Sequence, residues 1–420
     1  MFEQPTVFIL GAGASWHYGY PTGEELVKMV IAAAKKLKEF CELSKNKCDK
    51  KHIPQYISEI YKDNWDKAAL DCQRLIDALE AVHPLVIDYF LSQNKDLQPI
   101  GKLMIAWVIL ECEAVFLYSK HNENRIELLK NSPDKEEQKR VAKGLVDAKK
   151  YNDNWYRFIL HQLLNGLQSS EDLLSKSKKN NVTFISFNYD VSLETQLRNG
   201  LEKVQLLNET DINKAHVEEF FKNNLIIHVY GSIRDFQKNK DMASLTPDAV
   251  QKRLEVFTSI ETTTKTDYGF PIKIPKEPIL YKNLLDEVYE ASQNIETIGV
   301  EKQENPIVNA NAEKAQKLIE KAQVVYILGY GFDELNNNLL GLKENLSKNG
   351  LSINHQRNIM FTNFENSERI NKRAGILFAN KPNLFANGNV AFKQTVTTNF
   401  QYERSIKNVY EAFADDFDAI

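Results

Sequence analysis

The apolar residues of the chain fall into short unbroken runs, separated by longer stretches with helical spacing. Residues Thr6 to Leu10 (TVFIL), Val182 to Phe187 (VTFISF) and Asn224 to Tyr230 (NLIIHVY) form such runs, and similar ones surround Val325 and Met360. Runs without polar alternation are typical of strands that are buried on both faces. Because strand patterns alternate with helix patterns, the sequence predicts an α/β fold with a mostly parallel sheet and helices on both faces.

A long stretch, residues 41–179, lacks a convincing strand pattern. Its apolar residues repeat at helical spacing, as in the segment NWYRFILHQLLNGL around Trp155. A chain of 420 residues is also too long for one ordinary core. We therefore predict one α/β domain, built from residues 1–40 and 180–420, that carries residues 41–179 as a large helical insertion.

The most apolar stretch, Leu103 to Tyr118, is interrupted by Glu111 and Glu113. It is shorter than the roughly 20 residues that span a bilayer, so it predicts a buried helix and no membrane contact. The first apolar run, Val7 to Leu10, is too short for a secretory signal and lacks a basic leader. We expect a cytoplasmic protein.

Charge and cysteine content narrow the classes of function. Lysine and arginine number 53 against 57 acidic residues, a formal net charge of −4. This balance gives no overall attraction to nucleic acid, so sequence-specific nucleic-acid binding is not expected. The cysteines Cys41, Cys48, Cys72 and Cys112 form no Cys-x-x-Cys pair, which argues against a zinc site, and no metal is expected.

The first candidate for chemistry is Gly11-Ala12-Gly13-Ala14-Ser15, between the first strand and the helix expected after it. A glycine turn in this place lets backbone N–H groups approach a pyrophosphate. The dinucleotide-binding fingerprint is incomplete, because its third glycine position holds Trp16. A tight turn with a purely structural role is the alternative.

Asn188 and Asp190 directly follow the second strand. At the carboxyl end of a strand in an open sheet, such side chains can hydrogen-bond a ribose, a water or a carboxamide. They could instead cap a helix that begins near Val191.

His228 and Tyr230 end the third strand, where alternation would place them on one face. A histidine there could act as a base or be a satisfied core residue. Gly329-Tyr330-Gly331 and Thr362-Asn363-Phe364-Glu365 follow two further strands. Because all these turns follow strands of one predicted sheet, we expect them to face a single crevice.

In order and form, the motifs resemble the sirtuin-like NAD-consuming family, in its bacterial anti-phage branch. GAGAS…GYPTG resembles the cofactor loop, SFNYD the Asn-x-Asp signature, HVYGS the His-Gly segment, and GYG and TNFE the turns at the adenosine half. The similarity covers Thr6 to Glu25 and then about Val182 to the C-terminus. The helical insertion is not covered.

The resemblance implies a Rossmann-like NAD-binding domain and a role for each matching residue. Asn188 would hold the nicotinamide ribose or the attacking water, Asp190 would engage the carboxamide, and His228 would complete the catalytic set. The other implied cofactor-binding residues lie at the phosphates (Gly11, Ala12, Gly13, Ser15), in a mobile cofactor loop (Tyr20, Pro21, Thr22) and on the adenosine side (Gly329, Gly331, Asn363, Glu365).

Two departures from the family pattern bear on activity. The deacylases of the family carry a zinc module with paired cysteines, which this chain lacks, so the resemblance favours plain hydrolysis of NAD to nicotinamide and ADP-ribose. The family histidine directly precedes the glycine, a position held here by Tyr230. His228 lies two residues earlier and is our choice for the role, with Tyr230 as the other candidate.

The resemblance thus implies an NAD glycohydrolase that depletes NAD as an effector of anti-phage abortive infection. Cleavage passes through a cation-like ribose and needs a placed water but no metal. The alternatives are a module that binds NAD or ADP-ribose without turnover, favoured by the displaced histidine, and an ADP-ribosyltransferase. Related proteins imply a homo-oligomer and a partner such as a HerA-type hexameric ATPase, with the helical insertion as the contact surface.

Overall fold

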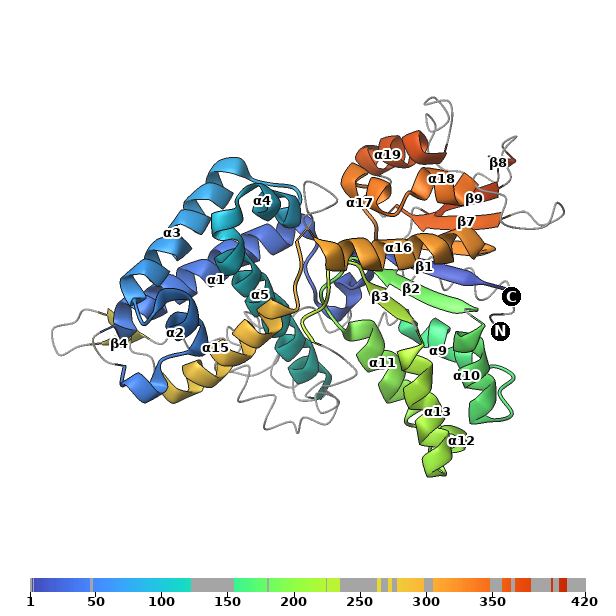
Figure 1. Cartoon of the computed structure of the whole chain (residues 1–420), viewed down its shortest axis with the longest axis horizontal. Helices are drawn as coiled ribbons and strands as arrows, with labels where there is room; N and C mark the ends of the chain where they lie inside the picture. The colour runs from blue at the N-terminus through green and yellow to red at the C-terminus, as the bar shows by residue number, and fades with distance from the viewer. Residues whose placement is uncertain are drawn as a thin grey trace, which may run out of the picture.

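Figure 1 shows the computed structural model of the chain, with a β-sheet domain beside a lobe made of helices. The residues that the structure describes are 2, 4–45, 48–121, 155–179, 181–223, 225–234, 263–265, 271–273, 278–297, 305–347, 357–363, 367–378, 394–395 and 400–405.

The main sheet has the strand order β3-β2-β1-β6-β7-β9-β8. All neighbouring pairs from β3 to β9 are parallel, and β8 pairs antiparallel with β9 at one edge. This confirms the predicted α/β, Rossmann-like fold. The strands are β1 (Thr6–Leu10), β2 (Val182–Ser186), β3 (Ile226–His228), β6 (Val324–Leu328), β7 (Arg357–Thr362), β8 (Gln394–Thr395) and β9 (Phe400–Ser405).

The central strand β1 explains why the first apolar run shows no alternation. All five residues of β1 are buried, as are all those of β2. Phe8 stacks between Phe184 of β2 and Tyr326 of β6, with ring centroids 4.8 and 4.9 Å apart. The chain builds β2 and β3 on one side of β1 and then β6 and β7 on the other. The carboxyl ends of β1 and β6 therefore flank the topological switch point, where such sheets bind ligands.

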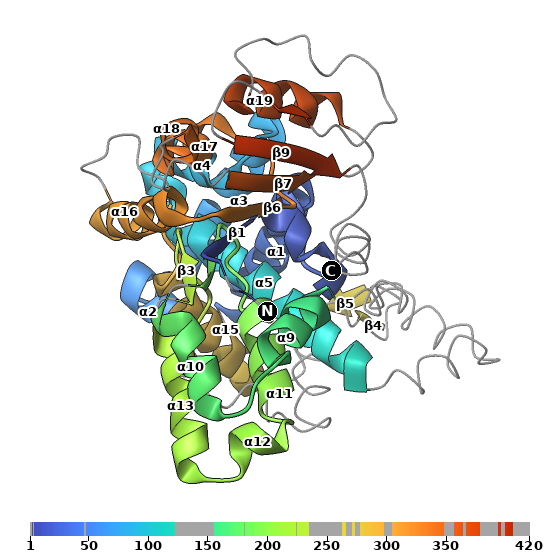
Figure 2. The same ribbon diagram turned by 90° about the vertical axis from the view of Figure 1, so that its right-hand side faces the viewer.

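Helices cover both faces of the sheet, and the remaining ones form the lobe. On the β2–β3 side, Figures 1 and 2 show α9 (Tyr156–Leu164), α10 (Ser170–Lys178), α11 (Ser192–Leu201), α12 (Gln205–Asn208) and α13 (Asp211–Lys222). Toward β6, β7 and β9 lie α16 (Pro306–Lys321), α17 (Glu334–Leu339), α18 (Leu342–Ser347) and α19 (Glu368–Phe378).

The helical lobe draws on both parts of the chain. Its helices are α1 (Gly23–Ser44), α2 (Gln55–Tyr61), α3 (Trp65–Val82), α4 (Ile87–Gln93), α5 (Gln98–His121) and α15 (Pro278–Gln293), with the hairpin β4 (Thr263–Lys265) and β5 (Pro271–Lys273) nearby. Helix α1 packs against α3 and α5, and α15 packs against α5 and α2. The segment predicted as an insertion also supplies α9 and α10, which pack against α11 and α13 of the sheet domain.

Helix α1 reaches into the lobe because it is long and starts at the sheet. At its start Thr22 and Glu25 form a capping box, in which the Thr22 N–H donates to Glu25 Oε2 at 2.7 Å. Helix α5 contains the apolar stretch noted above, and its residues from Leu103 to Leu110 are all at most 5% exposed. It is therefore a buried core helix, and none of the described helices is long and apolar enough to span a bilayer.

Candidate functional site

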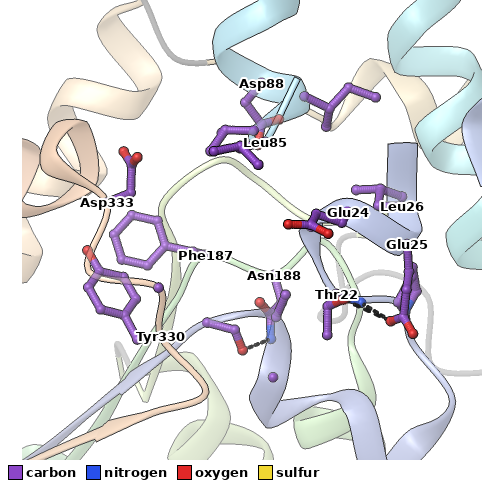
Figure 3. Close-up of a pocket in the computed structure, with 18 of the residues that line it drawn as sticks. Thr22, Glu24, Glu25, Leu26, Leu85, Asp88, Phe187, Asn188, Tyr330 and Asp333 are labelled. Atoms are coloured by element: carbon purple, nitrogen blue, oxygen red, sulfur yellow. Dashed lines mark hydrogen bonds between the residues drawn. The ribbon is translucent and has the colours of Figure 1, made fainter. Parts of the chain in front are cut away.

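The carboxyl ends of β1, β2, β6 and β7 open into a cavity of about 1220 Å³ between the sheet and the helical lobe. Figure 3 shows Asn188, Phe187 and Tyr330 on the sheet side of this cavity, and Leu85 and Asp88 on the lobe side. Most residues expected from the sequence line it: Gly11, Ala12, Gly13, Ser15, Tyr20, Pro21, Thr22, Asn188, Asp190, Gly329, Gly331 and Asn363. His228 is not among the lining residues, and Glu365 lies outside the described residues.

The two glycine turns at the switch point pack directly on each other. The N–H of Gly13 donates to the Gly329 carbonyl at 3.0 Å. A Cβ on Gly13 would lie 2.8 Å from Gly329 Cα, and one on Gly11 would lie 2.5 Å from the Gly329 carbonyl oxygen. Gly329 itself has a φ of +57°, and a Cβ there would meet the Ala14 nitrogen at 2.1 Å. Packing between the turns therefore requires these glycines, whatever ligand they face.

The same packing uses most of the backbone donors of the first turn. Gly11 N–H donates to the Leu328 carbonyl at 3.0 Å, and Gly13 N–H to that of Gly329. Within the turn, Ala14 N–H donates to the Gly11 carbonyl at 2.9 Å and Ser15 N–H to the Ala12 carbonyl at 3.2 Å. Only Ala12, among Gly11 to Ser15, keeps an N–H without a backbone acceptor in this part of the structure. The turn thus offers a ligand fewer N–H groups than its glycine pattern suggests.

Asn188 is fixed to the first turn by its side chain. Its Nδ2 donates to the Gly11 carbonyl at 3.0 Å and to Ser15 Oγ at 2.9 Å. The amide oxygen Oδ1 consequently faces away from that turn, and it accepts no hydrogen bond from another described residue. Helix α11 has Val191 as its N-cap, without a side-chain cap, so Asn188 is not a capping residue.

Asp190 is 5% exposed and bonds locally. Its Oδ1 accepts from the Ser192 N–H at 3.0 Å and from the Ser192 hydroxyl. Burial raises the pKa of Asp190, whereas hydrogen bonds from Ser192 and Ser15 act in the opposite direction. Ser15 therefore links the two strand-end residues, because it bonds both Asn188 and Asp190.

Two aromatic residues at the start of α9, Trp155 and Tyr156, contact the first glycine turn and the residues that bond to Asp190. Trp155 Nε1 donates to the Ala14 carbonyl at 2.8 Å, and Tyr156 stacks on Tyr18 with ring centroids 4.2 Å apart. The Tyr156 hydroxyl lies 2.9 Å from Ser192 Oγ. Helical periodicity placed Trp155 on an apolar helix face, but did not connect it with the first turn.

His228 is held by two hydrogen-bond acceptors. Nδ1 lies 2.8 Å from the Asn188 carbonyl, and Nε2 lies 2.5 Å from Glu194 Oε1. Both contacts are satisfied together only when both ring nitrogens carry a proton. Burial lowers the pKa of His228, but the charge and hydrogen bond of Glu194 outweigh it and the pKa is raised. An imidazolium in this position cannot accept a further proton.

The alternation expected for His228 and Tyr230 does not hold, because β3 ends at His228 and the chain then turns. Tyr230 lines the cavity, packs on Phe187 with ring centroids 5.6 Å apart, and donates its hydroxyl to Asn336 Oδ1. The strand end thus aims the tyrosine, and not the histidine, at the cavity.

The lobe side contributes a carboxyl group that no motif indicated. Asp88, in the first turn of α4, lines the cavity and accepts a hydrogen bond from the Tyr189 hydroxyl. Burial raises the pKa of Asp88 to about 6, against the opposing effect of the Tyr189 hydrogen bond. Asp88 lies in residues 41–179, predicted as an insertion, where the sequence shows none of the strand-end motifs, and an aspartate in the first turn of a helix is common in any protein.

The β6–β7 side of the cavity holds two buried polar atoms that lack hydrogen-bond partners among the described residues. These atoms are the Tyr330 hydroxyl and Asn363 Oδ1, and both residues line the cavity. The amide nitrogen of Asn363 is occupied, because it donates to the Ser367 carbonyl at 3.1 Å and to Asn371 Oδ1 at 2.7 Å. Buried polar groups are normally paired, so these two atoms suit a polar ligand such as a ribose or a base.

Fold and cavity together define a Rossmann-like α/β protein with a ligand-sized cavity at its switch point, roofed by a helical lobe. Comparisons with models of protein families, with curated proteins and with solved structures find no match to this chain. Among the described residues, no group of three or more histidine, cysteine, aspartate or glutamate side chains could hold a metal ion.

Proposed function

We propose that this chain is an NAD glycohydrolase, which cleaves the nicotinamide–ribose bond to give nicotinamide and ADP-ribose. The observation that carries the proposal is the position of Asn188, fixed by two hydrogen bonds at the switch point with its Oδ1 directed away from the glycine turn. A pre-oriented acceptor in a cavity is what the reaction needs to hold a ribose hydroxyl or the attacking water.

The reaction requires few groups from the protein. The nicotinamide ring leaves with the electron pair of the glycosidic bond and becomes neutral, so it needs no acid. Water adds to the ribose carbon and releases one proton. Asn188 orients the water or the ribose hydroxyl, and Asp190 accepts a hydrogen bond from the nicotinamide carboxamide.

The size of the cavity supports an extended ligand. Its volume of about 1220 Å³ exceeds the roughly 300–1,000 Å³ of ordinary small-molecule sites. The nicotinamide half would lie toward Asn188, and the adenosine half toward Tyr330 and Asn363, whose unpaired polar atoms suit a ribose or an adenine.

His228 has a positioning role in this proposal. Its Nδ1–H holds the backbone carbonyl of Asn188 at 2.8 Å, and Glu194 fixes the ring from the other side. The histidine therefore acts on the reaction through Asn188, and Tyr230 is the side chain from this strand end that reaches the ligand.

The family resemblance extends the proposal to biology. The chain would act as an NAD-depleting effector of phage defence, in a homo-oligomer or with a partner such as a HerA-type ATPase. The mass of the purified chain, measured alone and with the product of the neighbouring gene, tests these assemblies.

Nicotinamide release from NAD is the direct test of the activity. We expect the purified chain, alone or with its partner, to release nicotinamide and ADP-ribose in equal amounts. Label transferred from NAD to protein would instead indicate ADP-ribosyl transfer. Absence of nicotinamide in every assembly would contradict the proposal.

A binding module without turnover is the second candidate. It is favoured by the state of His228, because an imidazolium that lies outside the cavity, with both ring nitrogens in hydrogen bonds, provides no base. Calorimetry separates the two candidates: a binding module gives saturable heat with NAD, and all of the NAD is recovered intact.

A further inference from the structure

Two arginines on α19 reach the cavity from the side of the second glycine turn. Arg369 and Arg373 are four residues apart in the helix, so they lie on one face of it, and both line the cavity. Helix α19 follows β7, the strand after the second glycine turn. The other lysine or arginine among the described lining residues is Lys28 of α1.

A dinucleotide brings two phosphate charges to the switch point, and the first turn is poorly equipped for them. The N–H groups of Gly11, Gly13, Ala14 and Ser15 are already bound to backbone carbonyls. If one of these N–H groups donated to a phosphate instead, a backbone carbonyl would lose its hydrogen bond, which would offset much of the free energy gained by binding. Another source of donors and positive charge is therefore needed.

Arg373 stands where the second turn opens to the cavity. Its Nη1 donates to the Gly331 carbonyl at 3.0 Å. A Cβ added at Gly331 would meet nothing within 4 Å, so there is open space beside this contact. A guanidinium carries five N–H donors, which leaves several for an oxyanion in that space.

Arg369 has an ion pair that is easily exchanged. Its Nη1 lies 3.7 Å from Glu24 Oε1, and the two side chains are 53% and 60% exposed. Ion pairs this exposed contribute little free energy, so a phosphate can replace Glu24 at small cost. Asp333 also lines the cavity, but its Oδ1 caps α17 by accepting from Leu335 N–H at 3.0 Å.

We propose that Arg369 and Arg373 form a diphosphate clamp, which holds the two phosphates of the bound dinucleotide in place of the first glycine turn. The clamp rests on the proposed function only in that its ligand is an NAD-type dinucleotide. Its chemistry requires a diphosphate, whether or not the nicotinamide bond is cleaved.

Calorimetry with ADP-ribose, NAD and adenosine tests the clamp in the full chain. We expect Arg373→Gln to weaken ADP-ribose and NAD on the order of 10-fold, and Arg369→Gln with Arg373→Gln on the order of 100-fold, because charge-assisted hydrogen bonds are lost. Adenosine affinity should stay unchanged. The dependence of ADP-ribose affinity on salt should flatten in the double variant.

Matched variants guard against loss of folding. Lys372→Gln removes a neighbouring, exposed charge from α19 that does not line the cavity, and it should keep ADP-ribose affinity within about twofold. Arg373→Lys keeps the charge but loses the planar fork, and should bind with intermediate affinity. Thermal unfolding of each variant confirms that it is folded.

The outcomes separate the clamp from the hydrolase. Weakened ADP-ribose binding in the double variant supports the clamp, even when the wild-type chain cleaves no NAD. A double variant with wild-type affinity and KM overturns the clamp, even when NAD is hydrolysed. A wild-type chain that binds neither NAD nor ADP-ribose overturns both.

Discussion

The floor and the roof of the cavity are built in different ways. The floor, formed by the turns after β1, β2 and β6, is fixed by backbone hydrogen bonds and by contacts between glycines. The roof, formed by residues 82–90, includes several exposed apolar side chains, with Val82 at 59%, Leu85 at 52% and Tyr89 at 46%. Changes at the packed glycines of the floor should therefore act on folding, and changes at the exposed apolar side chains of the roof on ligand binding.

The largest effect is expected for Gly329→Ala in the floor. A side chain at a φ of +57° is strained, and its Cβ would clash with the Ala14 nitrogen. We expect a loss of about 3 kcal/mol or more in the free energy of unfolding, measured with denaturant, because strain and overpacking combine. Gly331→Ala is the matched control: its Cβ meets open space, so stability should change little.

A stable Gly329→Ala variant would show that the two turns do not depend on their glycine contacts. Gly13→Val would likewise push against Gly329 Cα, so a loss of NAD affinity in that variant would not separate a folding defect from a binding defect.

A smaller effect, dependent on pH, is expected at Asp88 in the roof. The pKa of Asp88 is about 6 in the folded chain, against 3.8 for an ordinary aspartate, so between these two pH values the folded chain holds a proton that the unfolded chain has lost. Stability should therefore fall as pH rises through that window, and Asp88→Asn should remove this fall. Because Asp88 is only partly buried, solvent screening should keep the effect below that of Gly329→Ala.

Unfolding measured from pH 4 to pH 7 checks this, with Asp96→Asn as the control. Asp96 is an exposed carboxylate in the same lobe, with its side chain 59% exposed and paired with Arg74. The control should keep the slope of the wild type. An unchanged slope in Asp88→Asn would mean that Asp88 is hydrated in the folded chain.

The smallest effect is expected for Leu85→Ala. Because Leu85 is half-exposed, the free energy of unfolding should change by less than about 0.5 kcal/mol. NAD affinity should fall several-fold, since the ligand would bury less apolar surface, on the order of 1 kcal/mol. Leu70→Ala, which removes a 58% exposed leucine outside the cavity, should leave both quantities unchanged. Equal affinities for NAD in the two variants would show that NAD does not contact Leu85 in the roof.

The sequence predicts the floor well because strand ends determine it. The buried runs locate β1, β2, β6 and β7, and the rule for parallel sheets then brings their turns to one edge. Gly13, Asn188 and Gly329 meet there as expected. His228 is placed differently, because the pattern does not reveal that β3 ends at this residue.

Strand-end patterns could not predict the roof or the two arginines of α19 that line the cavity. Asp88 meets Tyr189 across 101 residues of sequence, and Arg373 meets Gly331 across 42. A charged residue on a helix has the same local pattern whether it faces solvent or a cavity. Only the packing of α4 and α19 against the sheet domain distinguishes the two cases.

Turnover of Asn188→Ala tests the central proposal most directly. The matched control is Asn181→Ala, which removes an amide-to-backbone bond, from Nδ2 to the Phe2 carbonyl at 3.2 Å, at the opposite end of β2. Nicotinamide release by Asn188→Ala should fall on the order of 100-fold or more, while NAD affinity changes much less and Asn181→Ala stays active. Full nicotinamide release by a folded Asn188→Ala variant would contradict the proposal that this cavity is the catalytic site.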